Sequence, residues 1–177
     1  MAIERSTRPI AKARLATLAR RLLDASTLCA IATVSPPSRA HVNTAYFAWS
    51  DRFDLVWLSE PRAKHSRNVR ASATVAVAVY DSNQSWGNPG DRGIQLFGTA
   101  RELAGSAARD AERTYAKRFP DYRESEFSAY RFYRFRPRQL KLFDEHALGD
   151  GVFVTANVSR GQLAWTRTEI YDGRSAR

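Results

Sequence analysis

Hydrophobic positions near the start of the chain follow helical spacing. Between residues 7 and 24 the apolar side chains recur at intervals of four, three and four residues, which defines one face of a helix. These residues are Ala11, Leu15, Leu18 and Leu22. We therefore predict a helix over Thr7–Asp24, capped by Thr7, with Pro9 in the first turn, where its missing amide proton costs nothing.

Short apolar segments separated by turn residues follow this helix. Their β-branched content and spacing are typical of antiparallel strands. The predicted strands are Thr27–Val34, His41–Trp49, Phe53–Ser59, Thr74–Tyr80 and Gly93–Leu103. A short helix should begin at Pro61, with Ser59 as a possible cap. Gly98 inside the last of these strands indicates a bulge or the close approach of another backbone.

The second half of the chain continues with mixed elements. We expect a loop over residues 81–91, a helix over Gly105–Arg118, and two strands separated around Pro137. Those strands are Tyr130–Pro137 and Leu140–Phe143, a further strand is possible over residues 152–158, and residues 160–177 are expected to form a mobile tail. The element order favours one α+β domain over 1–177, with a barrel over 26–158 and no doubly wound parallel sheet.

Charge and cysteine content limit the function classes. The 177 residues carry a formal charge of +10, but the basic residues are scattered, so we expect no nucleic-acid partner. An anionic small ligand explains a basic site equally well. Cys29 is the single cysteine, and no signal peptide or membrane span is expected, so we predict a cytoplasmic protein.

Catalytic motifs do not stand out in the chain. It has neither a Gly-rich nucleotide loop nor histidines at metal-ligand spacing, so we predict no catalytic side chain and no metal ligand. Cys29, inside an apolar strand, is interpreted as an inert core thiol.

Four stretches resemble a known family in their order and separation. They are Cys29–Val34, Arg39–Phe47, Leu58–Val69 and Gly93–Ala100. Together they resemble the pyridoxamine 5′-phosphate oxidase-like FMN-binding proteins, and the stretch from Tyr133 to Asp144 is similar to the closing strands of that family. The resemblance implies an α+β, mainly β fold, a six-stranded antiparallel split β-barrel with flanking helices. It also implies a homodimer with FMN and a small-molecule substrate.

The resemblance also implies which residues would bind the cofactor. Those on the second strand would contact the flavin ring largely through their backbone, and those around the short helix would hold the phosphate. The set comprises Asn43, Thr44, Ala45, Tyr46, Ser59, Lys64, His65 and Gln95. An amide-rich helix start beside Lys64 suits a phosphate.

The chain departs from the family pattern at several positions. Ala63 stands where family members often have Ser or Thr, and Asn43 replaces an arginine of the true oxidase. The arginine–histidine substrate motif has no counterpart near Trp165, a residue that in an alternative interpretation stacks on the flavin of a partner chain. Pyridoxamine phosphate is therefore not the expected substrate. A deazaflavin-dependent reductase and a non-enzymatic flavin-binding module remain as alternatives, and haem binding is a further possibility.

Overall fold

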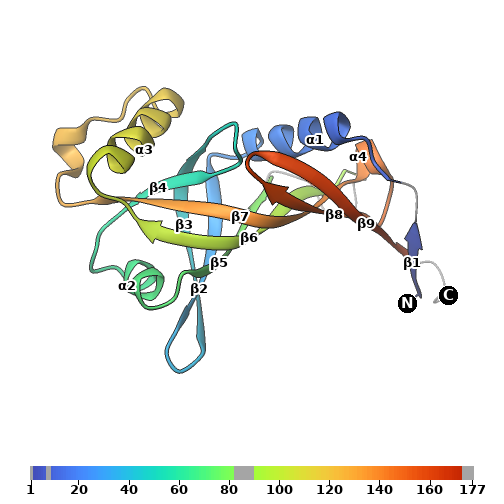
Figure 1. The fold of residues 1–177 in the computed structure, drawn as a ribbon, viewed down its shortest axis with the longest axis horizontal. Helices are drawn as coiled ribbons and strands as arrows, with labels where there is room; N and C mark the ends of the chain where they lie inside the picture. Colours follow the sequence, from blue (N-terminus) through green and yellow to red (C-terminus); the bar gives the residue numbers. More distant parts are fainter. Residues whose placement is uncertain (1, 7–8, 82–89, 173–177) are drawn as a thin grey trace. The chain divides into compact units, whose positions relative to one another are not determined.

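The computed structural model describes residues 2–6, 9–81 and 90–172, in which short helices interrupt runs of strands (Figure 1). The strands are β1 (Ala2–Ser6), β2 (Leu28–Ser35), β3 (Arg39–Trp49), β4 (Leu55–Ser59), β5 (Thr74–Tyr80), β6 (Arg92–Glu102), β7 (Arg131–Asp144), β8 (Val152–Ser159) and β9 (Gln162–Asp172). The helices are α1 (Lys12–Asp24), α2 (Lys64–Ala71), α3 (Gly105–Arg118), η1 (Glu124–Phe127) and α4 (Glu145–Leu148).

The strands form one antiparallel sheet that partly closes on itself. Their order is β1-β9-β8-β7-β4-β3-β2-β5-β6, and an additional β7–β6 pairing closes a ring. The predicted mainly β, α+β class and the split barrel are confirmed, with nine strands in place of the six expected. None of the helices in the described residues combines the length and apolar character that crossing a membrane requires.

The chain divides into two compact units. The first comprises residues 1–26, 78–96 and 138–177, and the second comprises residues 27–77 and 97–137. Strands β5, β6 and β7 contribute residues to both units. The prediction of a single domain over 1–177 stays a prediction.

In the first unit, the apolar face of α1 is buried. Leu15, Leu18 and Leu22 are at most 5% exposed, as their helical spacing predicts. The helix lies along β9 (Figure 1). Arg21 in its last turn forms an ion pair with Asp144, whose side chain is only 1% exposed and also accepts a hydrogen bond from the Ala147 amide. The buried carboxylate is thus both paired and hydrogen-bonded.

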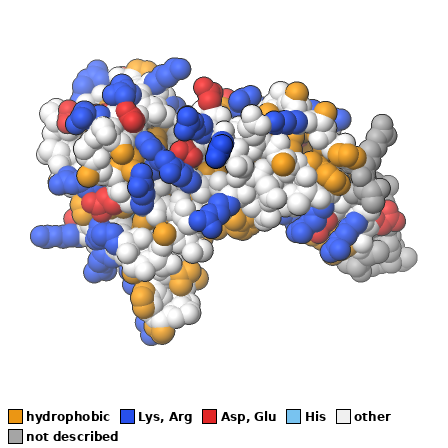
Figure 2. All heavy atoms as spheres, viewed as in Figure 1, with side chains coloured by type: hydrophobic (Ala, Val, Ile, Leu, Met, Phe, Trp, Pro, Cys, Tyr) orange, Lys and Arg blue, Asp and Glu red, His pale blue; other side chains and the backbone are white. Residues whose placement is uncertain are grey.

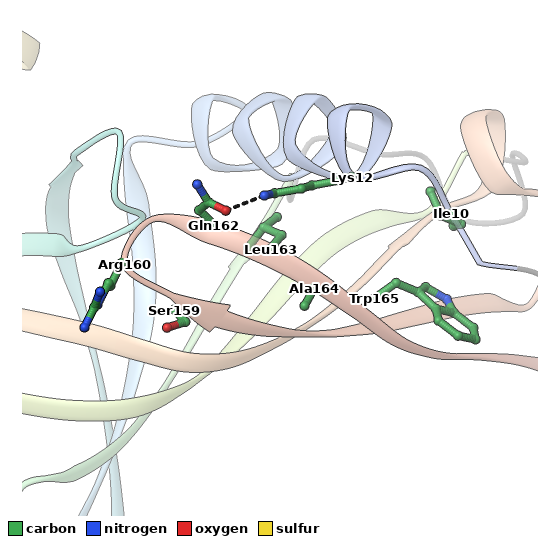
Figure 3. A pocket seen from close by; sticks show the side chains of 8 residues that line it. All are labelled: Ile10, Lys12, Ser159, Arg160, Gln162, Leu163, Ala164 and Trp165. Carbon is green, nitrogen blue, oxygen red and sulfur yellow. Dashed lines mark hydrogen bonds between the residues drawn. The ribbon is translucent and has the colours of Figure 1, made fainter.

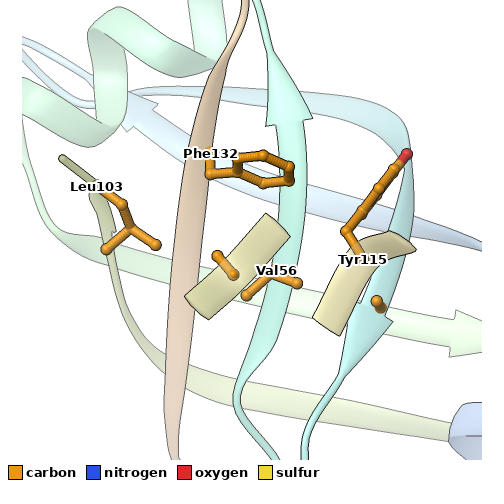
Figure 4. Packing of buried hydrophobic residues seen from close by; sticks show 6 residues of the cluster. Val56, Leu103, Tyr115 and Phe132 are labelled. Carbon is orange, nitrogen blue, oxygen red and sulfur yellow. The ribbon is translucent and has the colours of Figure 1, made fainter. Parts of the chain in front are cut away.

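In the second unit, a separate cluster packs α3 against the sheet. Val56, Leu103, Tyr115 and Phe132 form its centre, with Ala48 and Ala111 beside them (Figure 4). Trp57 and Tyr133 are fully buried and stack with ring centroids 5.7 Å apart. The stacked rings bury aromatic surface where β4 pairs with the first residues of β7.

The beginning of the chain differs from the prediction. Helix α1 begins at Lys12, with Ala11 as its N-cap, so Pro9 precedes the helix. Residues 2–6 form β1, which pairs with β9, and Thr7, the predicted cap, lies outside the described residues. Strand β1 was missed because its pairing with a distant segment leaves no local signal, and the start of α1 was placed too early because the caps that sequence suggests fix a helix start only to within a few residues.

The two strands predicted around Pro137 are one continuous strand, β7. Residues 131–135 pair with β4, and residues 139–143 pair with β8. Pro137 falls between the two pairings, where its missing amide proton interrupts neither ladder. The proline therefore marks a change of partner.

The end of the chain also differs from the prediction, because Gln162–Asp172 forms β9 instead of a mobile tail. This strand pairs with β8 on one edge and with β1 on the other. The predicted loop at 81–91 falls mostly on residues 82–89, which lie outside the described residues.

Candidate functional site

Polar side chains gather where β4 ends and α2 begins. Ser59 Oγ lies 2.6 Å from His65 Nε2, and Ser66 donates a hydrogen bond of 3.0 Å to the same Ser59 oxygen. Ser59 is 5% exposed and Ser66 is fully buried. The predicted pair Ser59 and His65 is therefore brought together, although Ser59 bonds a side chain of α2 and does not cap that helix.

The first turn of α2 is open to an acceptor. Ala63 is the N-cap and offers no side-chain oxygen, and the turn contains no acidic residue. Lys64, the first helical residue, is exposed. A Ser or Thr at position 63 would occupy one of the free amide protons of this turn. With alanine there, these amides and the Lys64 ammonium are left for an anion.

A second histidine adjoins this cluster. The rings of His41 on β3 and His65 are parallel, with centroids 6.4 Å apart and an interplanar angle of 5°. Burial lowers the pKa of His65 below its usual value, and the charge of His41 lowers it further. His65 is therefore mainly neutral at pH 7, and an anion bound nearby would favour its protonation.

Burial of a neutral His65 has a consequence for stability. Because its folded pKa is lowered, the unfolded chain binds more protons once the pH falls through the usual histidine range, at about 6.5. We expect the wild type to lose more stability between pH 7.5 and 5.5 than His65→Gln, whose amide oxygen can accept from Ser59 without titrating. Urea unfolding midpoints at the two pH values measure this. Equal pH dependence in both proteins would contradict it.

Two buried polar residues hold α2 on the sheet. Asn68 donates from Nδ2 to Thr33 Oγ1 at 3.0 Å, and Thr33 donates to the His41 carbonyl at 3.4 Å. Asn68 and Thr33 are at most 2% exposed. The sequence interpretation missed these residues, together with His41 and Ser66. Ser66 and Asn68 share the buried face of α2 with Val69, and a polar residue three positions before Val69 was the available signal.

On β3, the predicted contacts alternate between two faces. Asn43 and Ala45 are half-buried on the face of the sheet that His41 shares, whereas Thr44 and Tyr46 are exposed on the opposite face. The side-chain oxygen Oδ1 of Asn43 is buried and has no hydrogen-bond partner in the described structure. Of the four predicted residues of β3, only Asn43 and Ala45 can contact the same ligand with their side chains.

The backbone of β3 offers a further contact surface. Residues 39–46 pair with β2 along one edge, and β4 pairs only with residues 47–49 on the other. Among the described residues, the second edge of 39–46 thus has no partner strand. Its unpaired amides and carbonyls can bind a ligand, as the predicted backbone contacts of residues 43–46 require.

The last of the predicted residues lies in the other compact unit. Gln95 is exposed on β6 and belongs to the first unit, whereas the other seven predicted residues belong to the second. Cys29 is buried, and burial raises the pKa of its thiol to about 12, so it stays protonated at neutral pH. In the described residues no group of three or more His, Cys, Asp or Glu side chains forms a possible metal site.

Comparisons with solved structures find the same fold. A pyridoxamine 5′-phosphate oxidase-related, FMN binding protein from Nostoc punctiforme is 14% identical, with 90% of this chain and 94% of that chain covered and a TM-score of 0.60. A heme binding protein from Mycobacterium smegmatis is 13% identical, with 92% and 89% covered and a TM-score of 0.59. A FAD-binding protein from Mesorhizobium loti is 19% identical, with 79% and 94% covered and a TM-score of 0.57.

The sequence itself matches a family more directly. A search of curated proteins finds no match. The family model described as pyridoxamine 5′-phosphate oxidase matches residues 15–144, which include β2, β3, β4 and α2. Because this match spans most of the chain, the protein belongs to the pyridoxamine 5′-phosphate oxidase family.

Proposed function

We propose that the protein binds FMN in its second unit and acts as an FMN-dependent oxidoreductase on a small organic substrate. The observation that carries this proposal is the open first turn of α2, where Ala63 caps nothing and Lys64 is exposed beside the Ser59–His65 pair. A phosphate offers the several acceptor oxygens and the negative charge that such a helix start favours. The FMN- and FAD-binding proteins of the same fold support a flavin.

The residues of β3 fit the rest of a flavin. The buried Asn43 Oδ1 lacks a donor, and a flavin ring carries an N–H group that can supply one. The free edge of residues 39–46 can hydrogen-bond the other polar atoms of the ring. The Asn43 oxygen and the strand edge both carry hydrogen-bonding groups that an apolar neighbour would leave without partners.

The side chains then have distinct roles. Bound FMN would supply the hydride-transfer chemistry, so the protein needs no nucleophile of its own. Lys64 and the α2 amides bind the phosphate, and Ser59 with Ser66 orients His65 toward it. Asn43 positions the ring. In this proposal the family's true substrate, pyridoxamine phosphate, is replaced by another small molecule, since the arginine–histidine motif is missing near Trp165.

The proposed assembly is a homodimer formed through the outer face of β2 and β3. Leu28, Val34, Val42 and Tyr46 are 41–62% exposed on this face, and smaller side chains lie between them. Figure 2 shows hydrophobic side chains over the projecting β2–β3 hairpin. An apolar sheet face of this kind is typical of a protein–protein interface, and a second copy presents the same apolar surface.

A deazaflavin coenzyme is the second candidate cofactor. Arg62 and Arg67 are exposed close to Lys64, so three cations surround the start of α2. This charge suits the anionic polyglutamyl tail of such a coenzyme as well as a phosphate. Figure 2 shows Lys and Arg scattered over the face in view, with acidic side chains among them, and this distribution favours a small anion over a nucleic acid.

Ligand titration followed by reduction tests the proposal. The purified protein is titrated with FMN, riboflavin, the deazaflavin coenzyme and heme, and the protein loaded with the tightest ligand is then mixed anaerobically with NADH or NADPH. We expect FMN to bind at least about tenfold more tightly than riboflavin, a difference of about 1.4 kcal/mol, because riboflavin lacks the phosphate. Reduction of the bound flavin supports the oxidoreductase.

Other outcomes point elsewhere. Equal affinity for FMN and riboflavin would contradict the proposal that the start of α2 binds the phosphate. Binding of the deazaflavin coenzyme alone would show that it, and not FMN, is the cofactor of this fold. A bound flavin that neither nicotinamide nor candidate substrates reduce would favour the non-enzymatic flavin-binding module.

A further inference from the structure

A cavity in the first unit contains none of the residues assigned above to the flavin. It has a volume of about 620 Å³ and opens between the start of α1 and the β8–β9 hairpin (Figure 3). Its lining residues are Ile10, Lys12, Ser159, Arg160, Gln162, Leu163, Ala164 and Trp165. The volume lies within the range of small-molecule sites, about 300–1,000 Å³.

One wall of this cavity is a fixed aromatic ring. Trp165 is half-buried, and its indole Nε1 donates a hydrogen bond of 3.0 Å to Thr168 Oγ1. Thr168 is itself only 7% exposed, so the indole is anchored to an ordered partner. Ile10 and Leu163 contribute further apolar surface to the lining (Figure 3). A planar apolar group stacks well on such a ring.

The polar part of the lining is cationic. Lys12 donates a hydrogen bond to the amide oxygen of Gln162, a neutral partner. Within residues 2–6, 9–81 and 90–172, no carboxylate forms an ion pair with Lys12 or Arg160, and the lining contains no acidic side chain. Lys12 and Arg160 are exposed, with Arg160 at the hairpin end of the lining away from Trp165 (Figure 3), and their positive charges favour an organic anion.

The position of Arg160 is costly for the backbone. Arg160 and Gly161 form the two-residue turn between β8 and β9, with φ values of 51° and 78°. Such turns favour Asn-Gly or Gly-Gly, because other side chains resist a positive φ. An arginine held in this strained conformation at the edge of a cavity indicates a role for its side chain.

A neighbouring cavity provides room for a larger ligand. It has a volume of about 470 Å³, shares Ile10 with the first cavity, and is lined by Thr168, the anchor of the indole. Leu148, Val152 and Ile170 make most of its surface apolar. A ligand that extends along α1 would contact these apolar side chains and also meet Arg14 and Thr168.

We propose that the cavity of the first unit is a binding site for an aromatic carboxylate. Its ring contacts Trp165 and its carboxylate pairs with Lys12, while Arg160 adds positive charge at the hairpin turn. This site is independent of the flavin proposed for the second unit.

Calorimetric titration of the full chain with 2-naphthoate, and with the neutral 2-naphthalenemethanol, tests the proposal. We expect the wild type to prefer the carboxylate, and Lys12→Ala and Arg160→Gly each to weaken 2-naphthoate by about five- to tenfold. Trp165→Leu should weaken both probes. Arg109→Ala, which removes an exposed arginine from α3, is the matched control and should bind like the wild type.

Arg160→Gly also separates a ligand role from a structural one. Glycine relieves the positive φ, so this variant should unfold at a higher temperature than the wild type while binding the carboxylate more weakly. The proposal is overturned if the wild type does not bind 2-naphthoate at millimolar concentration, or if all variants bind it equally. It is also overturned if saturating FMN displaces 2-naphthoate, because the two ligands would then share one site.

Discussion

Replacing Gly98 with alanine should lower the free energy of unfolding by about 3 kcal/mol or more. A Cβ atom at position 98 would lie 2.1 Å from the Arg136 carbonyl oxygen and 2.8 Å from the Pro137 Cα. Both are backbone atoms of β7, so neither can rotate away, and the strands would have to separate. Urea unfolding followed by circular dichroism measures the change.

Gly105→Ala provides the control for this substitution. Gly105 has a φ of +58°, but no atom lies within 4 Å of its hypothetical Cβ. Its replacement by alanine should lower the free energy of unfolding by about 1 kcal/mol, because of the backbone conformation alone. If Gly98→Ala does not fold while Gly105→Ala does, the steric argument holds. Equal unfolding free energies for the two variants would contradict a close approach of β6 and β7.

The second large effect concerns the proposed phosphate site. Lys64→Ala/His65→Ala should weaken FMN by at least about tenfold, or about 1.4 kcal/mol, because it removes a charge and a hydrogen-bonding ring beside the α2 amides. Riboflavin affinity should stay nearly unchanged, since riboflavin has no phosphate. Fluorescence titration of the apoprotein measures both constants.

The control variant removes the same two residue types elsewhere. Lys117→Ala/His146→Ala changes an exposed lysine of α3 and an exposed histidine of α4. It should bind FMN like the wild type, so a loss in both double variants would indicate a general charge effect. Unchanged FMN affinity in Lys64→Ala/His65→Ala, with an intact circular dichroism spectrum, would exclude these residues from the site.

Local pattern predicted the elements whose signals are local. Strand β5 and helix α3 have the bounds expected from alternation and from Gly105 at a helix start. The other internal strands end within two residues of their predicted bounds, apart from β7. These segments carry their own periodicity and turn residues, so distant contacts were not needed to recognise them.

The site residues were predicted from the family resemblance. The structure places some of their side chains together and turns others to a different face of the sheet. Ser59 and His65 meet because β4 delivers one and the first turn of α2 delivers the other. Thr44 and Tyr46 were predicted with Asn43, yet strand alternation turns their side chains to the opposite face. His41 was not among the predicted site residues, and it reaches His65 only because β3 lies next to α2.

Local pattern was enough to predict most helix and strand positions, and the family resemblance added the mainly β class and the polar residues at the start of α2. Tertiary structure alone decided that residues 162–172 are β9, that Pro137 lies within one strand, and that Gly98 meets the backbone of β7. Each of these depends on pairing between segments far apart in the chain. The free energy gained by such pairing depends on the partner segment. Local propensity and periodicity therefore carry no information about it.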